Sequence, residues 1–273
     1  MLMKTLIVIP AYNAGDKIKP VLDFLREEKE HVIVVDDGST DDTKQVIIEQ
    51  GFFLIEHQTN MGLSYAIRSG LEYARAWGFE SIVTIDADGQ HDPRYINDFV
   101  LKLSSCDYVL GNRFYDTSYI PSCKIASNLF ASLIVYSITG RKITDVSCGY
   151  RGFNLRSFSF CGDVSGFEVV YDQLYRAISR GLIYSVVNVP VVYPCDEMHC
   201  TRVSEMISLL NVSMRYCFSR MLLMKLERVL CDVTKRVNFF VAIEGFSFFF
   251  FYVSCVDAYV LQTDLDKARS FYE

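Results

Sequence analysis

The hydrophobic pattern of the first hundred residues alternates between short apolar runs and amphipathic stretches. Four runs rich in β-branched residues have the length and composition of buried strands, at 5–9, 31–35, 52–55 and 81–85. Between these runs, apolar residues return at helical spacing, as in Ile18, Val21, Leu22 and Leu25. Strands that alternate with helices in this order predict a mostly parallel, doubly wound α/β sheet.

The alternation continues less regularly to about residue 193. Asp92 followed by Pro93 is typical of a helix start, because aspartate is a favoured N-cap and proline a favoured first helical residue. The elements predicted here are a helix over 92–103, a strand over 108–112, a helix over 121–139, a helix beginning near Glu168 and an edge strand over 184–193. The apolar positions of the 121–139 helix include Ile125, Leu129, Leu133 and Ile134.

Each of the first four strands is followed by a polar, turn-forming cluster. The clusters are Pro10–Gly15, Asp36–Asp42, Asn60–Gly62 and Asp86–Gln90. In open α/β sheets, ligands bind outside the carboxyl ends of the strands, so we expect the four clusters to converge on one binding site. The Gly-x-Gly-x-x-Gly and Walker loops are absent, which argues against the dinucleotide and ATP sites that use them.

Asp86 and Asp88 are the most informative residues of these clusters. If the strand continues through them, its alternating side chains place both carboxylates on the same side. Together with the amide oxygen of Gln90, these groups suit Mg²⁺ or Mn²⁺, which prefer oxygen ligands and also bind substrate phosphates. The alternative is an ordinary turn whose aspartates cap the next helix.

Composition and charge raise the question of a membrane partner. The chain has 273 residues, 51% of them hydrophobic, and a formal net charge of −6, so it is long enough to bury a large core. Residues 202–236 hold seven Lys and Arg against three Asp and Glu, and the apolar segment 237–256 that follows has Glu244 as its single charged residue. A basic segment beside an apolar one favours a membrane surface over nucleic acid.

We therefore expect an α/β domain over 1–204 and an amphipathic and apolar helical tail over 205–273. Segment 237–256 is long enough to span a bilayer, although Glu244 would be costly at depth; a soluble capping or dimer helix is the alternative. Nine cysteines without regular spacing, and an N-terminus that runs directly into a strand, favour a cytoplasmic protein at the inner face of the membrane.

Five motifs occur in an order and spacing that resemble a known family. They are Ile9-Pro10-Ala11-Tyr12-Asn13, Val34-Val35-Asp36-Asp37-Gly38-Ser39-Thr40-Asp41, Asn60-x-Gly62, Asp86-Ala87-Asp88-Gly89-Gln90-His91 and Cys148-Gly149-Tyr150-Arg151. Together they resemble the family-2 nucleotide-sugar glycosyltransferases, within them the branch of dolichyl-phosphate mannose synthase and the bacterial polyprenyl-phosphate sugar transferases. The resemblance covers residues 4–204 and makes 1–204 the expected catalytic domain.

The resemblance implies a Rossmann-like GT-A fold. It also implies inverting, metal-dependent transfer of a sugar from a UDP- or GDP-linked donor to polyprenyl phosphate or a cell-surface glycan. The residues that it places on the nucleobase and ribose are Pro10, Tyr12, Asn13 and Asp37. Those that it places on the metal and diphosphate are Asp86, Asp88 and Gln90. Arg113 and Arg151 match basic residues that face phosphate groups; a surface ion pair is the alternative for both.

Two positions depart from the pattern of the family. Many relatives have glutamate after Asn13, where this chain has Ala14, and Thr201-Arg202-Val203-Ser204 replaces the stretch that closes over the site. One alternative is therefore a degenerate, non-catalytic relative that binds nucleotide sugar or acts as a partner subunit. A nucleotidyltransferase is another, but the loop Pro10–Gly15 lacks the basic residue that such a phosphate-binding loop would favour.

The nature of the acceptor decides whether a general base is needed. A hydroxyl acceptor must lose its proton as it attacks, whereas a phosphate already carries negative charge near neutral pH. The candidate bases are Asp145, Glu168 and Asp172. Asp145, which precedes the Cys-Gly-Tyr-Arg motif, is the first choice; Glu168 is equally suited to stabilising the N-terminus of its helix. The sequence leaves this choice open, together with the sugar, the nucleobase and the oligomeric state.

Overall fold

The structure is a computed structural model that describes residues 4–158, 164, 166–191 and 205–218. The chain separates into two compact units, Met1–Cys217 and Phe218–Glu273, and every described residue except Phe218 lies in the first. Segment 237–256 and the stretch Thr201–Ser204, both important in the sequence analysis, lie outside the described residues.

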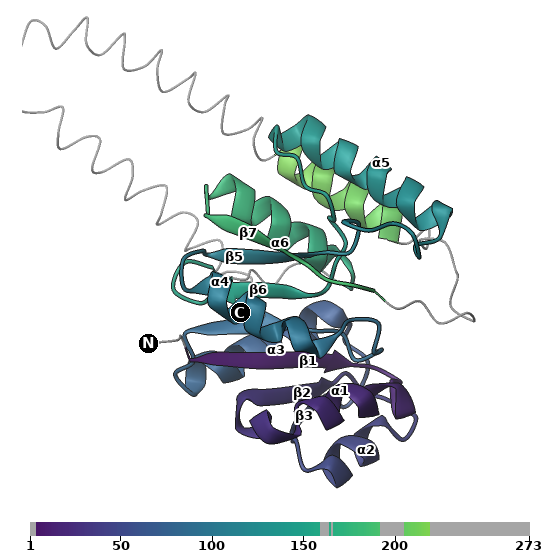
Figure 1. Cartoon of the computed structure of the whole chain (residues 1–273), viewed down its shortest axis with the longest axis vertical. Coiled ribbons are helices and arrows are strands. Elements are labelled where there is room, and N and C mark those ends of the chain that lie inside the picture. Colours follow the sequence, from purple (N-terminus) through teal and green to yellow (C-terminus); the bar gives the residue numbers. More distant parts are fainter. Residues whose placement is uncertain (1–3, 159–163, 165, 192–204, 219–273) are drawn as a thin grey trace, which may run out of the picture. The chain divides into compact units, whose positions relative to one another are not determined.

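In the described part of the chain, seven strands form one mixed sheet in the order β3-β2-β1-β4-β6-β5-β7 (Figure 1). The strands are β1 (Thr5–Ala11), β2 (Val32–Asp36), β3 (Phe53–Glu56), β4 (Ser81–Thr84), β5 (Tyr108–Asn112), β6 (Arg151–Asn154) and β7 (Tyr184–Asn188). All neighbours are parallel except β6, which runs antiparallel to both β4 and β5. The predicted mostly parallel α/β sheet is confirmed, and β6 is the strand that the hydrophobic pattern did not reveal.

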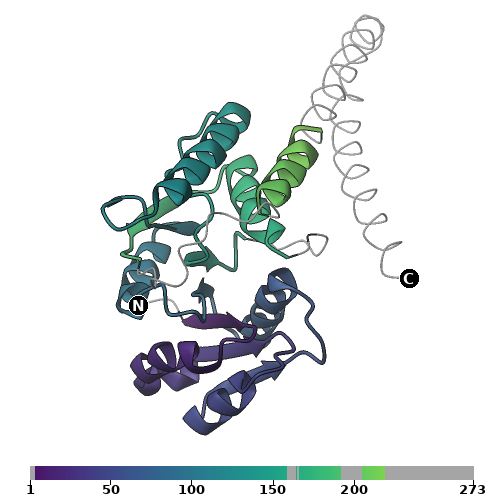
Figure 2. The same cartoon turned by 90° about the vertical axis from the view of Figure 1, so that its right-hand side faces the viewer.

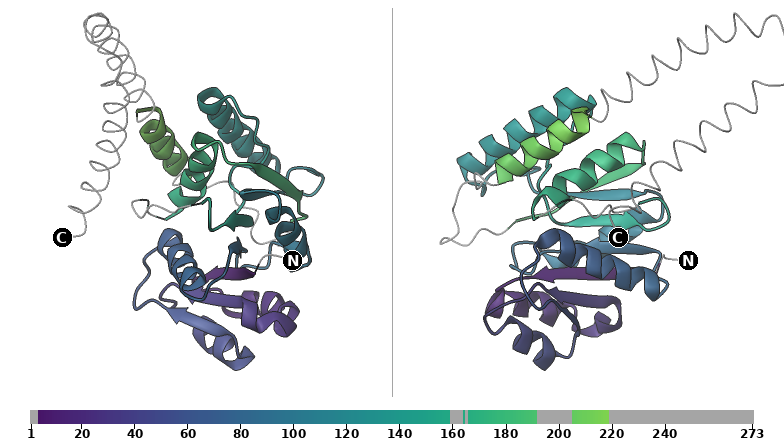
Figure 3. Two further views of the ribbon diagram at one scale, coloured as in Figure 1. Left: turned by 90° about the vertical axis from the view of Figure 1, so that its left-hand side faces the viewer. Right: turned by 180° about the vertical axis from the view of Figure 1, so that it is seen from behind.

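Helices cover both faces of the sheet, and Figures 2 and 3 show the arrangement from the side and from behind. One face packs against α1 (Lys19–Phe24), α2 (Thr43–Gln50) and α4 (Ile96–Leu103). The other packs against α3 (Leu63–Ala76), α5 (Ser122–Thr139), α6 (Glu168–Ser179) and a helix over residues 205–218. Short 3₁₀ turns occur at η1 (Gly15–Ile18), η2 (Arg26–His31) and η3 (Pro93–Tyr95).

The central strand β1 supplies both hydrophobic cores. Its side chains alternate, so Ile7 and Ile9 join the core beneath α1, α2 and α4, whereas Leu6 and Val8 join the core beneath α3, α5 and α6. Helix α3 approaches this strand so closely that a Cβ atom on Gly70 would overlap the side chain of Val8. Burial on both faces explains why the strand is a continuous apolar run.

The predicted helix start at Asp92 is confirmed, because the Asp92 side chain accepts a hydrogen bond of 2.9 Å from the backbone N–H of Arg94 at the start of η3. Strand β4 is shorter than the apolar run indicated and ends at Thr84. Ala87–Gly89 forms a turn, so strand alternation is not what orients Asp86 and Asp88.

Helix α5 differs from the expectation in the face that it buries. Leu129 and Leu133, two of its predicted apolar positions, are more than half exposed, whereas Asn128, Ala131 and Val135 are buried. Asn128 is satisfied there because its amide donates to the carbonyl of Thr144 at 2.6 Å and its oxygen accepts from the N–H of Val146 at 3.3 Å. The helix therefore turns an apolar stripe away from the core.

Residues 205–217 of the last described helix pack as part of the first compact unit. Leu209 and Val212 are buried in the same core as α6, and the Tyr175 and Ser213 hydroxyls lie 2.7 Å apart. Tyr216 also stacks on the ring of Tyr175, with centroids 4.7 Å apart. The first compact unit extends to Cys217. The division into a catalytic domain over 1–204 and a helical tail over 205–273 stays a prediction.

Arg151, predicted to face a phosphate, instead lies inside the fold and is 1% exposed. Its guanidinium donates to the backbone carbonyls of Cys148 (2.6 Å) and Val146 (3.0 Å) and to the Tyr108 hydroxyl (2.7 Å). It also donates to the Val170 carbonyl and the Gln173 side chain, both on α6. Arg151 is therefore neither a surface ion pair nor open to a ligand, and it connects β6 to β5 and α6.

Replacing Arg151 should mainly destabilise the protein. The substitution Arg151→Met leaves several buried acceptors without a donor, so the free energy of unfolding should fall by about 3 kcal/mol. The matched control is Arg156→Met, because Arg156 is exposed and pairs with Glu80 at the surface. That control should change the free energy by less than about 0.5 kcal/mol. Urea unfolding of both variants measures the difference, and equal effects would contradict the structural role.

Candidate active site

A cavity of about 930 Å³ opens at the carboxyl ends of β1 and β4. Its walls come from the loop after β1, the loop after β4, the segment after β5, and the helices α5, α6 and 205–218. The polar residues on its lining are Tyr12, Asn13, Lys17, Asp86, Asp88, Gln90, His91, Arg113, Lys124, Ser127, Asn128, Ser147, Tyr171 and Glu205. A pocket of this size is large enough for a drug-sized or nucleotide-sized ligand.

The last residues of β1 and the segment after it line part of the cavity with Pro10, Tyr12 and Asn13, all three predicted to contact the donor, together with Ala14 and Lys17. Tyr12 is 49% exposed, so its ring is available to a ligand. The loop after β2 fixes this part of the lining. Asn13 receives a hydrogen bond from the N–H of Thr40 at 2.8 Å, and the Thr43 hydroxyl oxygen accepts from the N–H groups of Ala14 and Gly15, each at 2.8 Å.

Asp37, predicted to contact the nucleotide, is 3% exposed and is not on the cavity lining. Its carboxylate accepts hydrogen bonds from the N–H groups of Met61 (3.0 Å) and Gly62 (2.6 Å) and lies 2.7 Å from Nδ1 of His57. The clusters Asp36–Asp42 and Asn60–Gly62 thus converge as predicted, but they support the first loop and do not line the cavity. A ribose contact by Asp37 stays a prediction.

Asp86, Asp88 and Gln90 all line the cavity, although they lie in a turn. Asp88 accepts a hydrogen bond of 2.9 Å from the N–H of Gln90, which fixes the turn. The Asp86 carboxylate lies so close to Gly149 that a Cβ atom there would be 2.5 and 2.6 Å from its two oxygens. Burial raises the pKa of Asp86, but His91 and the charges of Arg113 and Arg151 outweigh it and hold the pKa below its usual value.

The two carboxylates and the amide fit a divalent cation that binds together with a diphosphate. In the described residues, no three His, Cys, Asp or Glu side chains gather closely enough to hold a metal alone. Mg²⁺ and Mn²⁺ are often held by only one or two protein carboxylates, with waters and substrate phosphates completing the coordination. The ionised Asp86 and the neighbouring Asp88 and Gln90 match that limited set of oxygen donors.

Arg113 lines the cavity, and Asp145 holds its guanidinium. The two side chains form a bidentate pair, with Nε to Oδ2 at 2.7 Å and an Nη to Oδ1 at 2.9 Å, and the Arg113 guanidinium also donates to the Ser147 hydroxyl at 2.8 Å. Asp145 is 2% exposed and does not line the cavity. Burial raises the pKa of Asp145, but Arg113 lowers this pKa by more, so that the net shift is downward. The Asp145 carboxylate is therefore a weak base, and its contacts orient Arg113.

Glu168 does not reach the cavity lining either. Its carboxylate accepts hydrogen bonds from Arg215 and, at 3.4 Å, from Asn211, and both donors lie on the 205–218 helix. Asp172, the third candidate base, pairs with Arg176 on the same helix at 2.5 Å. The structure therefore engages each of the three predicted bases in a contact within the protein.

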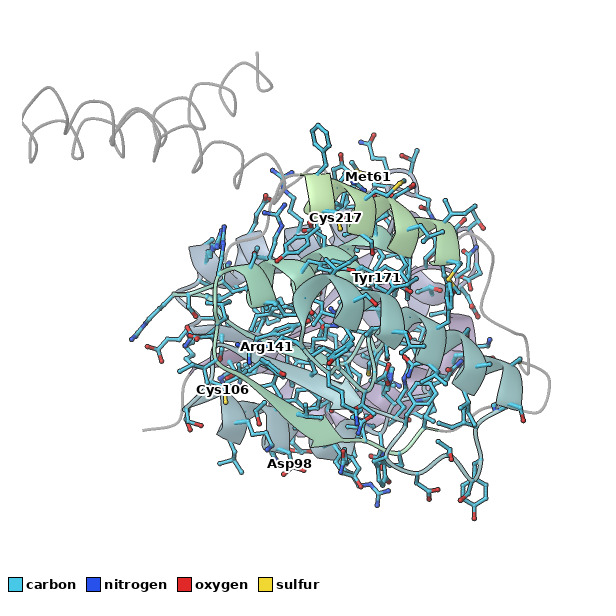
Figure 4. All side chains as sticks on the ribbon, turned by 90° about the horizontal axis from the view of Figure 1, so that it is seen from above. Met61, Asp98, Cys106, Arg141, Tyr171 and Cys217 are labelled. Carbon is cyan, nitrogen blue, oxygen red and sulfur yellow. The ribbon has the colours of Figure 1, made fainter. Side chains whose placement is uncertain are left out.

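Sequence reasoning missed several residues of the lining. Lys124 on α5 and Glu205 on the last described helix carry charge into the cavity wall, and Tyr171, labelled in Figure 4, lines it from α6. Burial lowers the pKa of Lys124, and the charge of Arg113 lowers it further, so these two cations are near enough to repel each other. No local motif marks these positions, because tertiary packing brings them together. His91, by contrast, directly follows Gln90 within a motif, and only its role was missed.

Comparison with known proteins agrees with this site. Residues 6–161 match Glycosyl transferase family 2. A UDP-N-acetylglucosamine–dolichyl-phosphate N-acetylglucosaminyltransferase of Methanococcus voltae is 29% identical over 258 residues, covering 82% of this chain and 97% of that protein. A polyprenol monophosphomannose synthase of Mycolicibacterium smegmatis is 26% identical over 217 residues, covering 74% of this chain and 81% of that protein.

The fold is also that of a solved structure. The glucosyl-3-phosphoglycerate synthase of Mycobacterium tuberculosis, crystallised with Mn²⁺, UDP-glucose and phosphoglyceric acid, has a TM-score of 0.59 at 20% identity, covering 77% of this chain and 80% of that chain. This likeness confirms the expected GT-A-type fold. The region that matches the family, residues 6–161, runs from β1 through β6 and so includes the loops that carry Tyr12, Asp86 and Arg113. The chain belongs to glycosyl transferase family 2 and is a glycosyltransferase.

Proposed function

We propose that this glycosyltransferase moves a sugar from a nucleoside-diphosphate sugar to a polyprenyl phosphate, with inversion, at the cytoplasmic face of a membrane. The observation that carries the proposal is the charge distribution of the cavity. The lining combines the carboxylates of Asp86 and Asp88, suited to a cation, with the charged groups of Arg113 and Lys124, suited to an anion. Two anionic reactants, a diphosphate leaving group and a phosphate nucleophile, match that distribution.

The donor occupies the end formed by the loops after β1 and β4. Tyr12 and Pro10 offer apolar surface to a nucleobase, and Asn13 is fixed by Thr40 so that this surface is ordered before binding. Asp86, Asp88 and Gln90 would hold a divalent cation, which when bound neutralises charge on the leaving diphosphate. Lys17 supplies a cation at the same end.

The acceptor end favours a phosphate over a sugar hydroxyl. Burial and the charge of Arg113 lower the pKa of Lys124 more than Glu205 and Asp88 raise it, so a bound phosphate would stabilise the charged ammonium group. Asp145 holds the Arg113 guanidinium in one orientation, which suits bidentate binding of a phosphate. Asp145, Glu168 and Asp172 are all engaged elsewhere, and a phosphate needs no base.

A single displacement accounts for inversion. In one displacement, an acceptor phosphate oxygen bonds to the anomeric carbon as the bond to the diphosphate oxygen breaks, and attack from the side opposite the leaving group inverts that carbon. The relatives support the acceptor class: one is named for dolichyl phosphate and one for polyprenol phosphate. Glu205 is the one lining carboxylate, among the described residues, that is neither assigned to the metal nor one of the predicted bases, and a hydroxyl acceptor would have to rely on it.

The membrane contact proposed here uses α5 and the 205–218 helix, which both border the cavity. Their exposed apolar residues in the first compact unit are Leu129, Phe130, Leu133, Tyr136, Ile207, Leu210 and Met214. Within the described residues, α5 is long enough and apolar enough to cross a bilayer, and 17% of its residues are buried. Exposed Arg141 and Lys142 directly after α5 suit anionic lipid headgroups. We propose that these faces lie on the bilayer surface and bring the cavity to its lipid acceptor.

The transfer reaction can be tested with purified protein, Mn²⁺ or Mg²⁺, a panel of UDP- and GDP-sugars, and a polyprenyl phosphate. We expect metal-dependent consumption of one donor that the lipid accelerates. Asp88→Asn should abolish transfer with the fold intact. Lys124→Met should lower kcat/KM for the lipid phosphate by roughly tenfold, because it removes a charged hydrogen-bond donor, and should leave donor affinity unchanged.

Three outcomes of that experiment would contradict the proposal. Turnover of Asp88→Asn at the rate of the wild type would refute the metal role. A rate of donor consumption that a glycan raises but the lipid does not change would indicate a hydroxyl acceptor. Glu205 would then be the next residue to mutate. Absence of metal-dependent binding of any donor would favour a degenerate relative.

Membrane contact can be tested by co-sedimentation of the full chain with vesicles that contain anionic lipid. The double substitution Leu129→Glu/Leu133→Glu should weaken vesicle binding roughly tenfold or more, since each leucine gains about 1.5 kcal/mol or more on burial. The matched control is Leu101→Glu, because Leu101 is 56% exposed on α4, against the opposite face of the sheet. Equal vesicle binding by all three proteins would contradict the assignment of these faces.

A further inference from the structure

His91 is a member of the Asp86–His91 motif for which the proposed chemistry has no role. Its side chain is 3% exposed, so the imidazole is not an obvious ligand for a substrate. Its Nδ1 atom points at Asp86 and lies 3.4 Å from Oδ2, yet it makes no well-aligned hydrogen bond to any described residue. A buried polar nitrogen without such a bond is costly, and its position calls for a reason.

Three neighbours besides Asp86 hold the imidazole and its backbone in place. Its Nε2 atom lies 3.6 Å from the sulfur of Cys148, which is fully buried. The ring meets Tyr150 edge-on, with centroids 5.5 Å apart, and Tyr150 in turn stacks on Phe99 at 4.3 Å. The backbone of His91 also pairs with that of Val191 in an isolated antiparallel bridge. The ring therefore has little freedom to turn away from the carboxylate.

The opposite side of Asp86 is equally constrained. Gly149 lies against both carboxylate oxygens, where any Cβ atom would overlap them. The Thr84 hydroxyl donates to the Gly149 carbonyl at 2.8 Å, so the glycine is itself tied to the end of β4. Asp86 is thus confined between an imidazole and a glycine backbone, while a third of its side-chain surface remains exposed.

We infer that His91 is a positioning residue: it holds the Asp86 carboxylate against Gly149, in the one orientation that presents an oxygen to the cation of the donor complex. This inference rests on the metal-dependent function proposed above. Of the two ring nitrogens of His91, Nδ1 faces Asp86 and can donate to it, whereas Nε2 faces Cys148. Groups that orient a metal ligand without touching the metal commonly control its affinity.

The test is a Mn²⁺ titration in the presence of UDP, or of GDP if that nucleotide binds more tightly, followed by the loss of the free Mn²⁺ EPR signal. Asparagine and leucine have similar size, but only the asparagine amide can donate near the position of Nδ1. His91→Leu should therefore weaken Mn²⁺ binding by roughly 10- to 100-fold, while His91→Asn should bind close to wild type. Gly149→Ala should also weaken binding, because it displaces the carboxylate from the other side.

The matched control is Phe99→Leu, which loosens the packing of Tyr150 without touching Asp86. It should lower the thermal midpoint and leave Mn²⁺ affinity unchanged, which separates orientation from general destabilisation. Wild-type affinity in His91→Leu, or equal losses in His91→Leu and His91→Asn, would overturn the inference. Failure of the wild-type protein itself to bind Mn²⁺ with either nucleotide would overturn the proposed function as well.

Discussion

The site depends on the close approach of the Asp86 carboxylate to the backbone of Gly149. That contact exists because β6 inserts next to β4 in the antiparallel direction, with Thr84 opposite Arg151 in the register. The segment before β6 consequently passes the end of β4 just where the chain turns into the acidic loop. A parallel strand in that place would begin at the opposite end of β4, away from the acidic loop. The direction of β6 therefore brings the motifs Asp86–His91 and Cys148–Arg151 into one site.

Arg113 and Arg151 have different roles in the structure. Both were expected to face phosphate groups. Arg113 follows the carboxyl end of β5, and Asp145 and Ser147 hold its guanidinium in position on the cavity wall. Arg151 begins β6 and points into the fold, where backbone carbonyls, a tyrosine and a glutamine accept its hydrogen bonds. Interior placement makes Arg151 a support for the segment that carries Gly149, and so it acts on the site only indirectly.

The sequence predicted most of the sheet and one half of the site. Strands buried on both faces are continuous apolar runs, and polar clusters at their carboxyl ends are local signals, so Tyr12, Asn13, Asp86 and Asp88 could be found. The rest of the lining could not, because Lys124, Tyr171 and Glu205 come from three helices that only tertiary packing joins. Nor could hydrophobicity show which face of α5 is buried: Asn128 faces inward because Thr144 and Val146 satisfy its amide, while Leu129 and Leu133 face outward.

The account centres on a cation held between Asp86, Asp88 and a donor diphosphate. Anomalous diffraction at the manganese absorption edge, from crystals grown with UDP or GDP and Mn²⁺, tests this most directly. The account predicts one strong peak within coordination distance of a carboxylate oxygen of Asp86 or Asp88 and of the nucleotide diphosphate. A bound nucleotide with no peak there, or a peak coordinated by other residues, would contradict it.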